Sequence, residues 1–206
     1  MKKITIALIM VISLIAPIQT MAESVTQNGT IIEPLEQNIE QIIDEITSEP
    51  RPINSDAIQN VKEYISEYFG NLGYDNIEYQ KFEYNDENNE NAIRHSSQAD
   101  VFLASTAESA IVDGIGENII VTKNSSIDTT KNLIISAHYD SAEDSVGAND
   151  NGSGVAAVLE LARILKDTEI PYNIKFILFS GEEKYMLGSR WYVGKLTEDE
   201  RKQIIG

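Results

Sequence analysis

Residues 131–189 read KNLIISAHYDSAEDSVGANDNGSGVAAVLELARILKDTEIPYNIKFILFSGEEKYMLGS, and the arrangement of apolar and polar residues in this segment predicts the architecture of the chain. It contains two short apolar runs, residues 133–137 and 174–179, each bounded by polar residues. Runs of this length, rich in Ile and Leu, are typical of buried strands in a parallel sheet. Parallel neighbours need a crossover connection, which is usually a helix.

The segment between the two runs supplies this crossover. Residues 152–165 place apolar side chains on one helical face, namely Val155, Val158, Leu159, Ala162 and Leu165. Pro171 cannot continue that helix and suits the connection to the next strand. Because a right-handed crossover brings the carboxyl ends of both strands to one edge, we predict an α/β fold with three α/β/α layers and a mixed, mainly parallel sheet.

Side chains that can bind metal follow both strands at that edge. His138 and Asp140 follow the first run, Asp150 precedes the helix, and Glu182 and Glu183 follow the second run. An imidazole with carboxylates suits zinc, with manganese or cobalt as alternatives. We expect Asp140 to hold the second ring nitrogen of His138, since the two share a strand face. One of the two glutamates would bind metal while the other takes a proton from an activated water.

Each of these residues also has a structural interpretation. His138 alone is more often structural at a strand end, Asp150 alone suits a helix N-cap, and two exposed glutamates suit a solvated strand end. Four clustered carboxylates with Lys184 as the nearby cation would nevertheless repel one another unless a further cation is present. The set as a whole therefore favours a metal site.

Four motifs occur here in a familiar order and strand–helix context: His138-x-Asp140-Ser141, Gly147-Ala148-x-Asp150-Asn151-x-Ser153-Gly154, Gly181-Glu182-Glu183 and Leu187-Gly188-Ser189. Together they resemble the co-catalytic zinc aminopeptidases, a family that includes aminopeptidase Y, bacterial leucyl aminopeptidases and glutamate carboxypeptidase. The resemblance implies two zinc ions, with His138 on one, Asp150 bridging both, and Glu183 on the second. It also implies that Asp140 orients His138, that Glu182 is the general base, and that the substrates are peptides or proteins.

The sequence departs from the family pattern at two places. Lys184, Tyr185 and Met186 follow the glutamates, where the family usually has a glycine. The family also completes its site with a downstream Asp and then a His, whereas the other histidine here, His95, lies upstream. The resemblance therefore implies that residues 35–206 form the N-terminal two-thirds of a zinc peptidase domain, with a sheet that is incomplete at the C-terminus and no activity in the chain alone.

Other functions remain open on the same scaffold. Glutaminyl cyclases share it but use one zinc ion, whereas retention of His138 favours two. A carboxypeptidase would need a basic pocket for the substrate carboxylate, for which Lys184 and Arg190 are the nearby candidates. A non-catalytic module or an inactive fragment is the alternative from outside the enzymes.

Composition and the N-terminus bear on compartment and partners. The net charge of -17 argues against nucleic-acid binding, and the absence of cysteine excludes disulfides and thiolate metal sites. Lys2 and Lys3, an apolar run over residues 4–18 and small residues before position 23 predict a signal peptide, residues 1–22. We therefore expect a secreted protein with a flexible lead over residues 23–34 and no membrane attachment after cleavage. The oligomeric state is not predicted.

The remaining pattern predicts further elements. Helices are expected over residues 35–46 and from residues 54–56 to about 70–73, with Pro50 and Pro52 between them. Strands are expected over residues 77–84, 101–104 and 118–122, and a helix over residues 187–193. Thr197 and Glu200 predict a capping box at the start of a last helix. His95 has polar surroundings and is not expected to bind metal.

Overall fold

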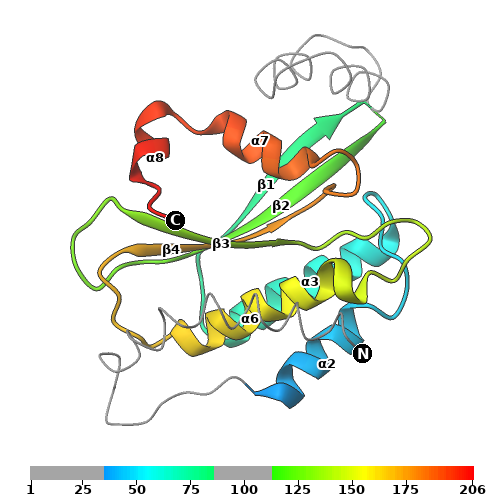
Figure 1. The fold of residues 1–206 in the computed structure, drawn as a ribbon, viewed down its shortest axis with the longest axis horizontal. Coiled ribbons are helices and arrows are strands. Elements are labelled where there is room, and N and C mark those ends of the chain that lie inside the picture. Colours follow the sequence, from blue (N-terminus) through cyan, green and yellow to red (C-terminus); the bar gives the residue numbers. More distant parts are fainter. Residues whose placement is uncertain (1–34, 86–112) are drawn as a thin grey trace, which may run out of the picture.

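The computed structural model of the 206-residue chain describes residues 35–85 and 113–206 (Figure 1). The predicted signal peptide over residues 1–22, the lead over residues 23–34, the strand over residues 101–104 and His95 lie outside the described residues. Within the described ranges no helix is long and apolar enough to cross a membrane.

Four strands form one mixed sheet in the order β1-β2-β4-β3. Their bounds are Ile77–Tyr84 for β1, Gly114–Lys123 for β2, Asn132–His138 for β3 and Asn173–Phe179 for β4. The pair β3 and β4 is parallel, whereas β2 is antiparallel to both β1 and β4. The α/β class and the mixed sheet are confirmed.

The expectation of a mainly parallel sheet is wrong for the described strands. The apolar pattern of a strand reports its burial but not its direction, which depends on the connection that leads to it. Residues 124–131 join β2 to β3 without a crossover helix, so β3 returns in the opposite direction. The crossover through α6 (Ser153–Leu165) then brings β4 back between β2 and β3, parallel to β3.

Three helices cover one face of the sheet and enclose the larger core. These are α2 (Glu36–Ile46), α3 (Asp56–Asn71) and α6, which lie together below the sheet in Figure 1. Ser55 is the N-cap of α3, and its side chain accepts the Ile58 N–H at 3.1 Å. The core side chains are fully or almost fully buried and include Ile42, Ile65, Phe69, Ile119, Leu159 and Phe176.

The other face carries a smaller core under α7 (Leu187–Lys195) and α8 (Glu198–Gln203), so the molecule has three layers (Figure 1). Tyr192 of α7 is buried against the sheet. The predicted capping box of α8 is present, with Thr197 and Glu200 bonding in both directions. Residues 204–206 run beside β3, where the Ile205 N–H donates to the Asn132 carbonyl at 2.9 Å.

The parallel register of β3 and β4 positions the predicted site. It runs from Asn132 opposite Asn173 to His138 opposite Phe179. Both strands therefore end at the same edge, and the segments that follow them begin there side by side.

Candidate metal centre

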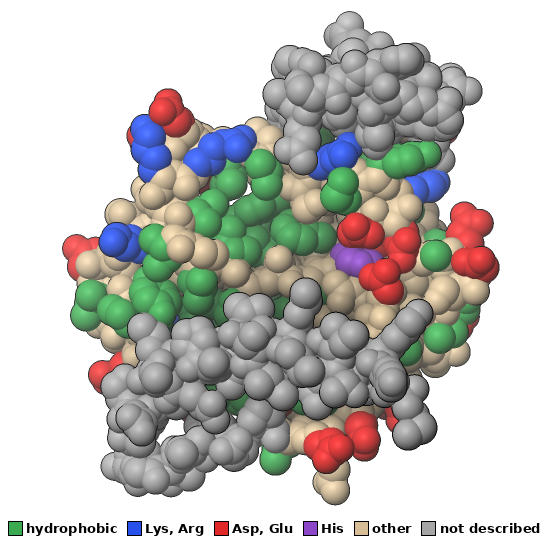
Figure 2. Space-filling view, viewed as in Figure 1, with side chains coloured by type: hydrophobic (Ala, Val, Ile, Leu, Met, Phe, Trp, Pro, Cys, Tyr) green, Lys and Arg blue, Asp and Glu red, His purple; other side chains and the backbone are tan. Residues whose placement is uncertain are grey.

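The carboxyl ends of β3 and β4 bring the predicted donor residues to one edge of the sheet. His138 is the last residue of β3, and Glu182 follows β4 after a turn at Gly181, whose φ is 71°. The Nε2 atom of His138 lies 3.8 Å from Oε2 of Glu182. In Figure 2 the one purple side chain, a histidine, is bordered by carboxylate groups in red.

Asp150 makes the closest contact with this imidazole. Its Oδ1 atom lies 3.0 Å from His138 Nε2, and the Asp150 side chain is 76% exposed while that of His138 is 8% exposed. The other ring nitrogen, Nδ1, lies 3.2 Å from the carbonyl oxygen of Asp140. A carbonyl only accepts, so this contact requires a proton on Nδ1.

The acidic neighbours set the charge of the imidazole. Burial by itself disfavours the charged form of His138. The hydrogen bond that the ring donates to Asp140 and the charge of Asp140, the hydrogen bond that it donates to Asp150 and the charge of Glu182 outweigh burial and raise the pKa of His138 to about 9. In the absence of a cation, a proton on the ring therefore neutralises part of the carboxylate charge.

Asp150 is not a helix cap in the structure. It lies in a tight turn, Ala148–Gly152, that leads into α6, and α6 begins without a side-chain cap. The peptide bond between Asp150 and Asn151 is cis. The turn is closed by a hydrogen bond of 2.9 Å from the Gly152 N–H to the Gly147 carbonyl, and this leaves the Asp150 carboxylate facing His138.

Asp140 joins the two strand ends. Its side chain is 1% exposed, and its two carboxylate oxygens accept the N–H groups of Glu182 and Glu183, each at 3.1 Å. One of these oxygens is also 3.5 Å from Nδ1 of His138. The expected contact with His138 is thus accompanied by a second one, with the backbone of the glutamate pair, which spacing along the sequence did not predict.

Glu183 is influenced by the whole cluster. Burial raises the pKa of its carboxyl, and the charge of Asp150 raises this pKa further. Glu182 and Asp140 act in the same direction and His138 opposes them. The carboxylates therefore repel one another at this edge, and a bound cation would relieve the repulsion.

The donor chemistry fits a divalent cation, although no complete coordination sphere is assembled. Across residues 35–85 and 113–206, no group of three or more His, Cys, Asp or Glu side chains is arranged to hold a metal ion. His138 Nε2 and Asp150 Oδ1 meet as a pair of donor atoms, with Glu182 next to them. Imidazole nitrogen and carboxylate oxygen are the donors that zinc accepts from proteins without cysteine.

Two residues that sequence analysis missed hold the loops at this edge. Asn118 of β2 is completely buried, accepts the Ser180 N–H at 3.2 Å and donates to the Gly188 carbonyl at 2.9 Å. Arg51 is also completely buried and donates to the loop after β3. The available signals were an Asn inside an apolar strand and an Arg between two prolines in an acidic chain.

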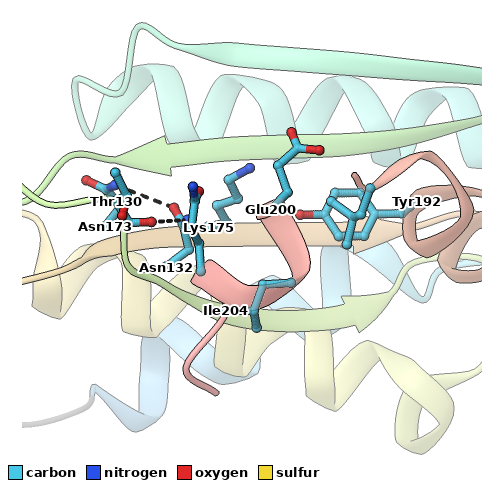
Figure 3. Close-up of a pocket in the computed structure, with 9 residues that line it drawn as sticks. Thr130, Asn132, Asn173, Lys175, Tyr192, Glu200 and Ile204 are labelled. Carbon is cyan, nitrogen blue, oxygen red and sulfur yellow. Dashed lines mark hydrogen bonds between the residues drawn. The ribbon is translucent and has the colours of Figure 1, made fainter. Parts of the chain in front are cut away.

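A hollow elsewhere on the molecule does not belong to the centre. Figure 3 shows it at the start of β3 and β4, which is the opposite end of these strands from His138. Its lining comprises Thr130, Asn132, Asn173, Lys175, Tyr192, Leu196, Glu200, Gln203 and Ile204. None of the predicted donor residues is among them.

Comparison with known proteins relates the region of the candidate site to one family. A model described as peptidase family M28 matches residues 118–205, which include all five predicted site residues. By this match, residues 118–205 are similar to peptidase family M28. Over 95 residues the chain is 43% identical to aminopeptidase YwaD of Bacillus subtilis (strain 168), and over 89 residues it is 36% identical to aminopeptidase Y of Saccharomyces cerevisiae.

These alignments cover parts of both partners. They span 46% and 43% of this chain but 21% and 16% of the two relatives, so the chain matches about a fifth of their length. The fold resembles BSAP, a zinc aminopeptidase from Bacillus subtilis, with a TM-score of 0.68 at 18% identity over 85% of this chain and 68% of that one. Porphyromonas gingivalis glutaminyl cyclase gives a TM-score of 0.57 at 18% identity over 76% and 51% of the two chains. At such identities the likeness shows the fold alone.

Proposed function

We propose that this protein is a secreted, zinc-dependent aminopeptidase that hydrolyses the peptide bond after the N-terminal residue of its substrate. The observation that carries the proposal is the contact of His138 with Asp150, beside Glu182, at the edge where a parallel crossover ends. The 43% identity to aminopeptidase YwaD supports this reaction over others on the same fold. The charged and apolar pattern of residues 1–22 supports secretion.

His138, Asp150 and Glu183 would hold two zinc ions, with cobalt or manganese as alternative metals. Zinc bound there supplies a water of lowered pKa and polarises the scissile carbonyl. The acidic edge also attracts the positively charged amino terminus of a peptide.

Glu182 is the proposed general base. Its side chain is 40% exposed, so a substrate and a water can reach it, and it lies next to His138. It would accept the proton of the attacking water and return that proton to the leaving amine. Asp140 holds the backbone of Glu182 through the N–H group and so fixes where the carboxylate begins.

A pair of variants tests these roles. With zinc present, Glu182→Gln is expected to keep zinc affinity and to lose about 10²- to 10⁴-fold in kcat on an amino-acid anilide, because the base is gone. Glu183→Gln is expected to lower zinc affinity instead. Glu169→Gln, an exposed glutamate after α6, serves as the control with unchanged values. Full turnover in Glu182→Gln would show that another group is the base.

Substrate choice separates the reactions that share this fold. An aminopeptidase cleaves amino-acid anilides and leaves N-acetylated peptides intact. Cyclisation of an N-terminal glutaminyl peptide without hydrolysis would indicate a glutaminyl cyclase. Release of C-terminal residues from N-acetylated peptides would indicate a carboxypeptidase. Lys184, a candidate for binding the substrate carboxylate in that case, lies over the ring of Tyr84 with its Nζ 5.4 Å from the centroid. Zinc binding without any turnover would favour a non-catalytic member of the family.

A further inference from the structure

Arg51 is a buried cation in the connection between α2 and α3. Its side chain is 0% exposed, and Pro50 and Pro52 flank it. A guanidinium buried so completely is costly unless hydrogen bonds satisfy its N–H groups. All three of its nitrogens donate to main-chain carbonyls: Nε to Tyr139 at 2.7 Å, Nη1 to Val146, and Nη2 to Gly147 at 3.1 Å.

These three carbonyls belong to the loop that joins the two predicted ligands His138 and Asp150. Tyr139 directly follows His138, while Val146 and Gly147 directly precede the turn that carries Asp150. The guanidinium of Arg51 therefore contacts both ends of the loop at once. Because it donates to main-chain carbonyls, it constrains the path of the main chain whatever the side chains at those three positions.

The backbone of Arg51 adds a second attachment through Ser141. The Arg51 N–H donates to Oγ of Ser141 at 2.9 Å, and the Ser141 N–H donates to the Arg51 carbonyl at 3.2 Å. The Ser141 hydroxyl is in turn 2.8 Å from the carbonyl of Ser145, to which it donates. The connection between α2 and α3 is thus hydrogen-bonded to the middle of the loop after β3 as well as to its ends.

Gly147 links the Arg51 contacts to the turn that carries Asp150. Its carbonyl accepts both from Arg51 and from the Gly152 N–H, which closes the turn around Asp150. Gly147 has a φ of 57°, and a Cβ atom there would lie 2.6 Å from the Asp150 carbonyl oxygen. The turn is therefore packed closely against the residue that Arg51 holds, and a shift of Gly147 would move Asp150.

The charge and shape of Arg51 suit this task better than any other side chain. Burial lowers the pKa of its guanidinium, and the negative charge of Asp140 acts in the opposite direction. The guanidinium stays charged at neutral pH and directs its donors in a planar fork. A lysine ammonium presents its donors from a single point and cannot reach three separated carbonyls in this arrangement.

We infer that Arg51 is a positioning residue of the metal site, which holds the loop after β3 in the shape that presents Asp150 to His138. Arg51 lies outside residues 118–205, the segment that the family model matches. The inference about metal binding rests on the proposed function, whereas the inference about the shape of the loop does not.

Hydrogen exchange on the metal-free protein tests the shape of the loop. The amides of residues 141–152 are expected to exchange about tenfold faster or more in Arg51→Lys and Arg51→Met, because the loop loses charged hydrogen bonds. Amides of β4 should exchange as in the wild type. The matched control is Arg163→Met, since Arg163 pairs with Glu160 on α6. Equal acceleration throughout the sheet would overturn the inference, because it would show general destabilisation.

Zinc titration of the same variants tests the consequence for the metal site. Zinc affinity is expected to fall about 10- to 100-fold in Arg51→Met, less in Arg51→Lys, and not in Arg163→Met. Circular dichroism confirms the folded fraction, and Arg51→Lys carries the test if Arg51→Met does not fold. Wild-type zinc affinity in both Arg51 variants would overturn the positioning role. If the wild-type protein itself fails to bind zinc, the proposed function is wrong, and hydrogen exchange still decides whether Arg51 fixes the loop.

Discussion

The loop after β3, residues 139–152, and the loop after β4, residues 180–188, bring donor residues to the same edge, but different backbone groups predominate in the contacts that hold them. The first loop turns carbonyl groups inward, and the buried guanidinium of Arg51 donates to them. The second turns three N–H groups inward, which Asp140 and Asn118 accept, and one carbonyl, that of Gly188, to which Asn118 donates. Buried backbone groups must be paired, so the direction in which a loop faces decides which kind of side chain can hold it.

The origin of the two anchors also differs. Arg51 comes from the connection between α2 and α3, far away in the sequence from the loop that it holds. Asn118 lies within β2, beside β4, and Asp140 belongs to the first loop itself. Since Asp140 holds the second loop, the two loops are coupled, and damage to the first is expected to reach the glutamate pair.

Removal of Asp140 should have the largest effect on this comparison. Asp140→Ala leaves two N–H groups without an acceptor and removes a negative charge that faces His138 and Arg51. We expect the free energy of unfolding in urea to fall by about 3–5 kcal/mol. Asp144→Ala, which changes an exposed residue of the same loop, should be neutral within about 0.5 kcal/mol. A small loss in Asp140→Ala would mean that the two loops are not coupled.

Asn118→Ala should have the next largest effect, and it acts on the second loop alone. It leaves the Ser180 N–H and the Gly188 carbonyl without their partner, which should cost about 2–4 kcal/mol in urea unfolding. Gln80→Ala removes only the side-chain contact to Asn118 and should cost much less. Hydrogen exchange that increased equally in the loop after β3 would contradict the assignment of Asn118 to the second loop.

Substitution of one glycine in each loop compares how tightly they are packed. A Cβ on Gly147 would lie 2.6 Å from a backbone oxygen, and a Cβ on Gly188 would lie 2.4 Å from the carbonyl oxygen of Ser180. Gly147→Ala and Gly188→Ala are each expected to lower the free energy of unfolding, measured by thermal denaturation, by about 1–3 kcal/mol. Gly70→Ala, in α3 with no atom within 4 Å of the added carbon, should instead stabilise by about 0.5–1 kcal/mol. A neutral Gly147→Ala would show that the first loop yields easily.

The smallest effect is expected at Glu160, outside both loops. Burial raises the pKa of Glu160, but hydrogen bonds from Arg163, the Leu35 N–H and Asn38 outweigh it and lower this pKa below its ordinary value. The stabilisation is therefore present above the ordinary carboxyl pKa and is lost as the pH falls through the lowered folded-state pKa. Glu160→Gln should cost about 1 kcal/mol at pH 7, and the difference from the wild type should vanish in acid. If the two proteins still differed in free energy of unfolding in urea at low pH, the stabilisation would not come from the ionised carboxylate of Glu160.

The sequence predicted most elements because their signals are local. The local signals are those of the crossover unit, the helix that starts at residues 54–56, the strand over residues 77–84 and the capping box at Thr197, each of which depends on residues close together in the chain. The expectation of a mainly parallel sheet was wrong for the described strands, because an apolar pattern carries no information about strand direction.

The sequence predicted that the candidate residues meet at one edge, but it did not predict the contacts that they make there. Spacing indicated that His138 and Glu182 meet at one edge, since a crossover aligns the ends of parallel strands. It did not indicate that the carboxylate of Asp140 accepts the N–H groups of the glutamate pair. Asp150, which alone suits a helix cap, faces the imidazole instead.

Which chemical groups reach this edge of the sheet follows from local sequence patterns, because periodicity and strand ends depend on neighbouring residues. How these groups are held follows from contacts between distant parts of the packed fold. Arg51 and Asn118 form hydrogen bonds with backbone groups that lie far away in the sequence. Backbone N–H and carbonyl groups are the same in almost every residue, so the residue types do not reveal which side chain pairs with them. The direction in which each loop turns its polar backbone depends on the packed fold, and so does the side chain that it requires.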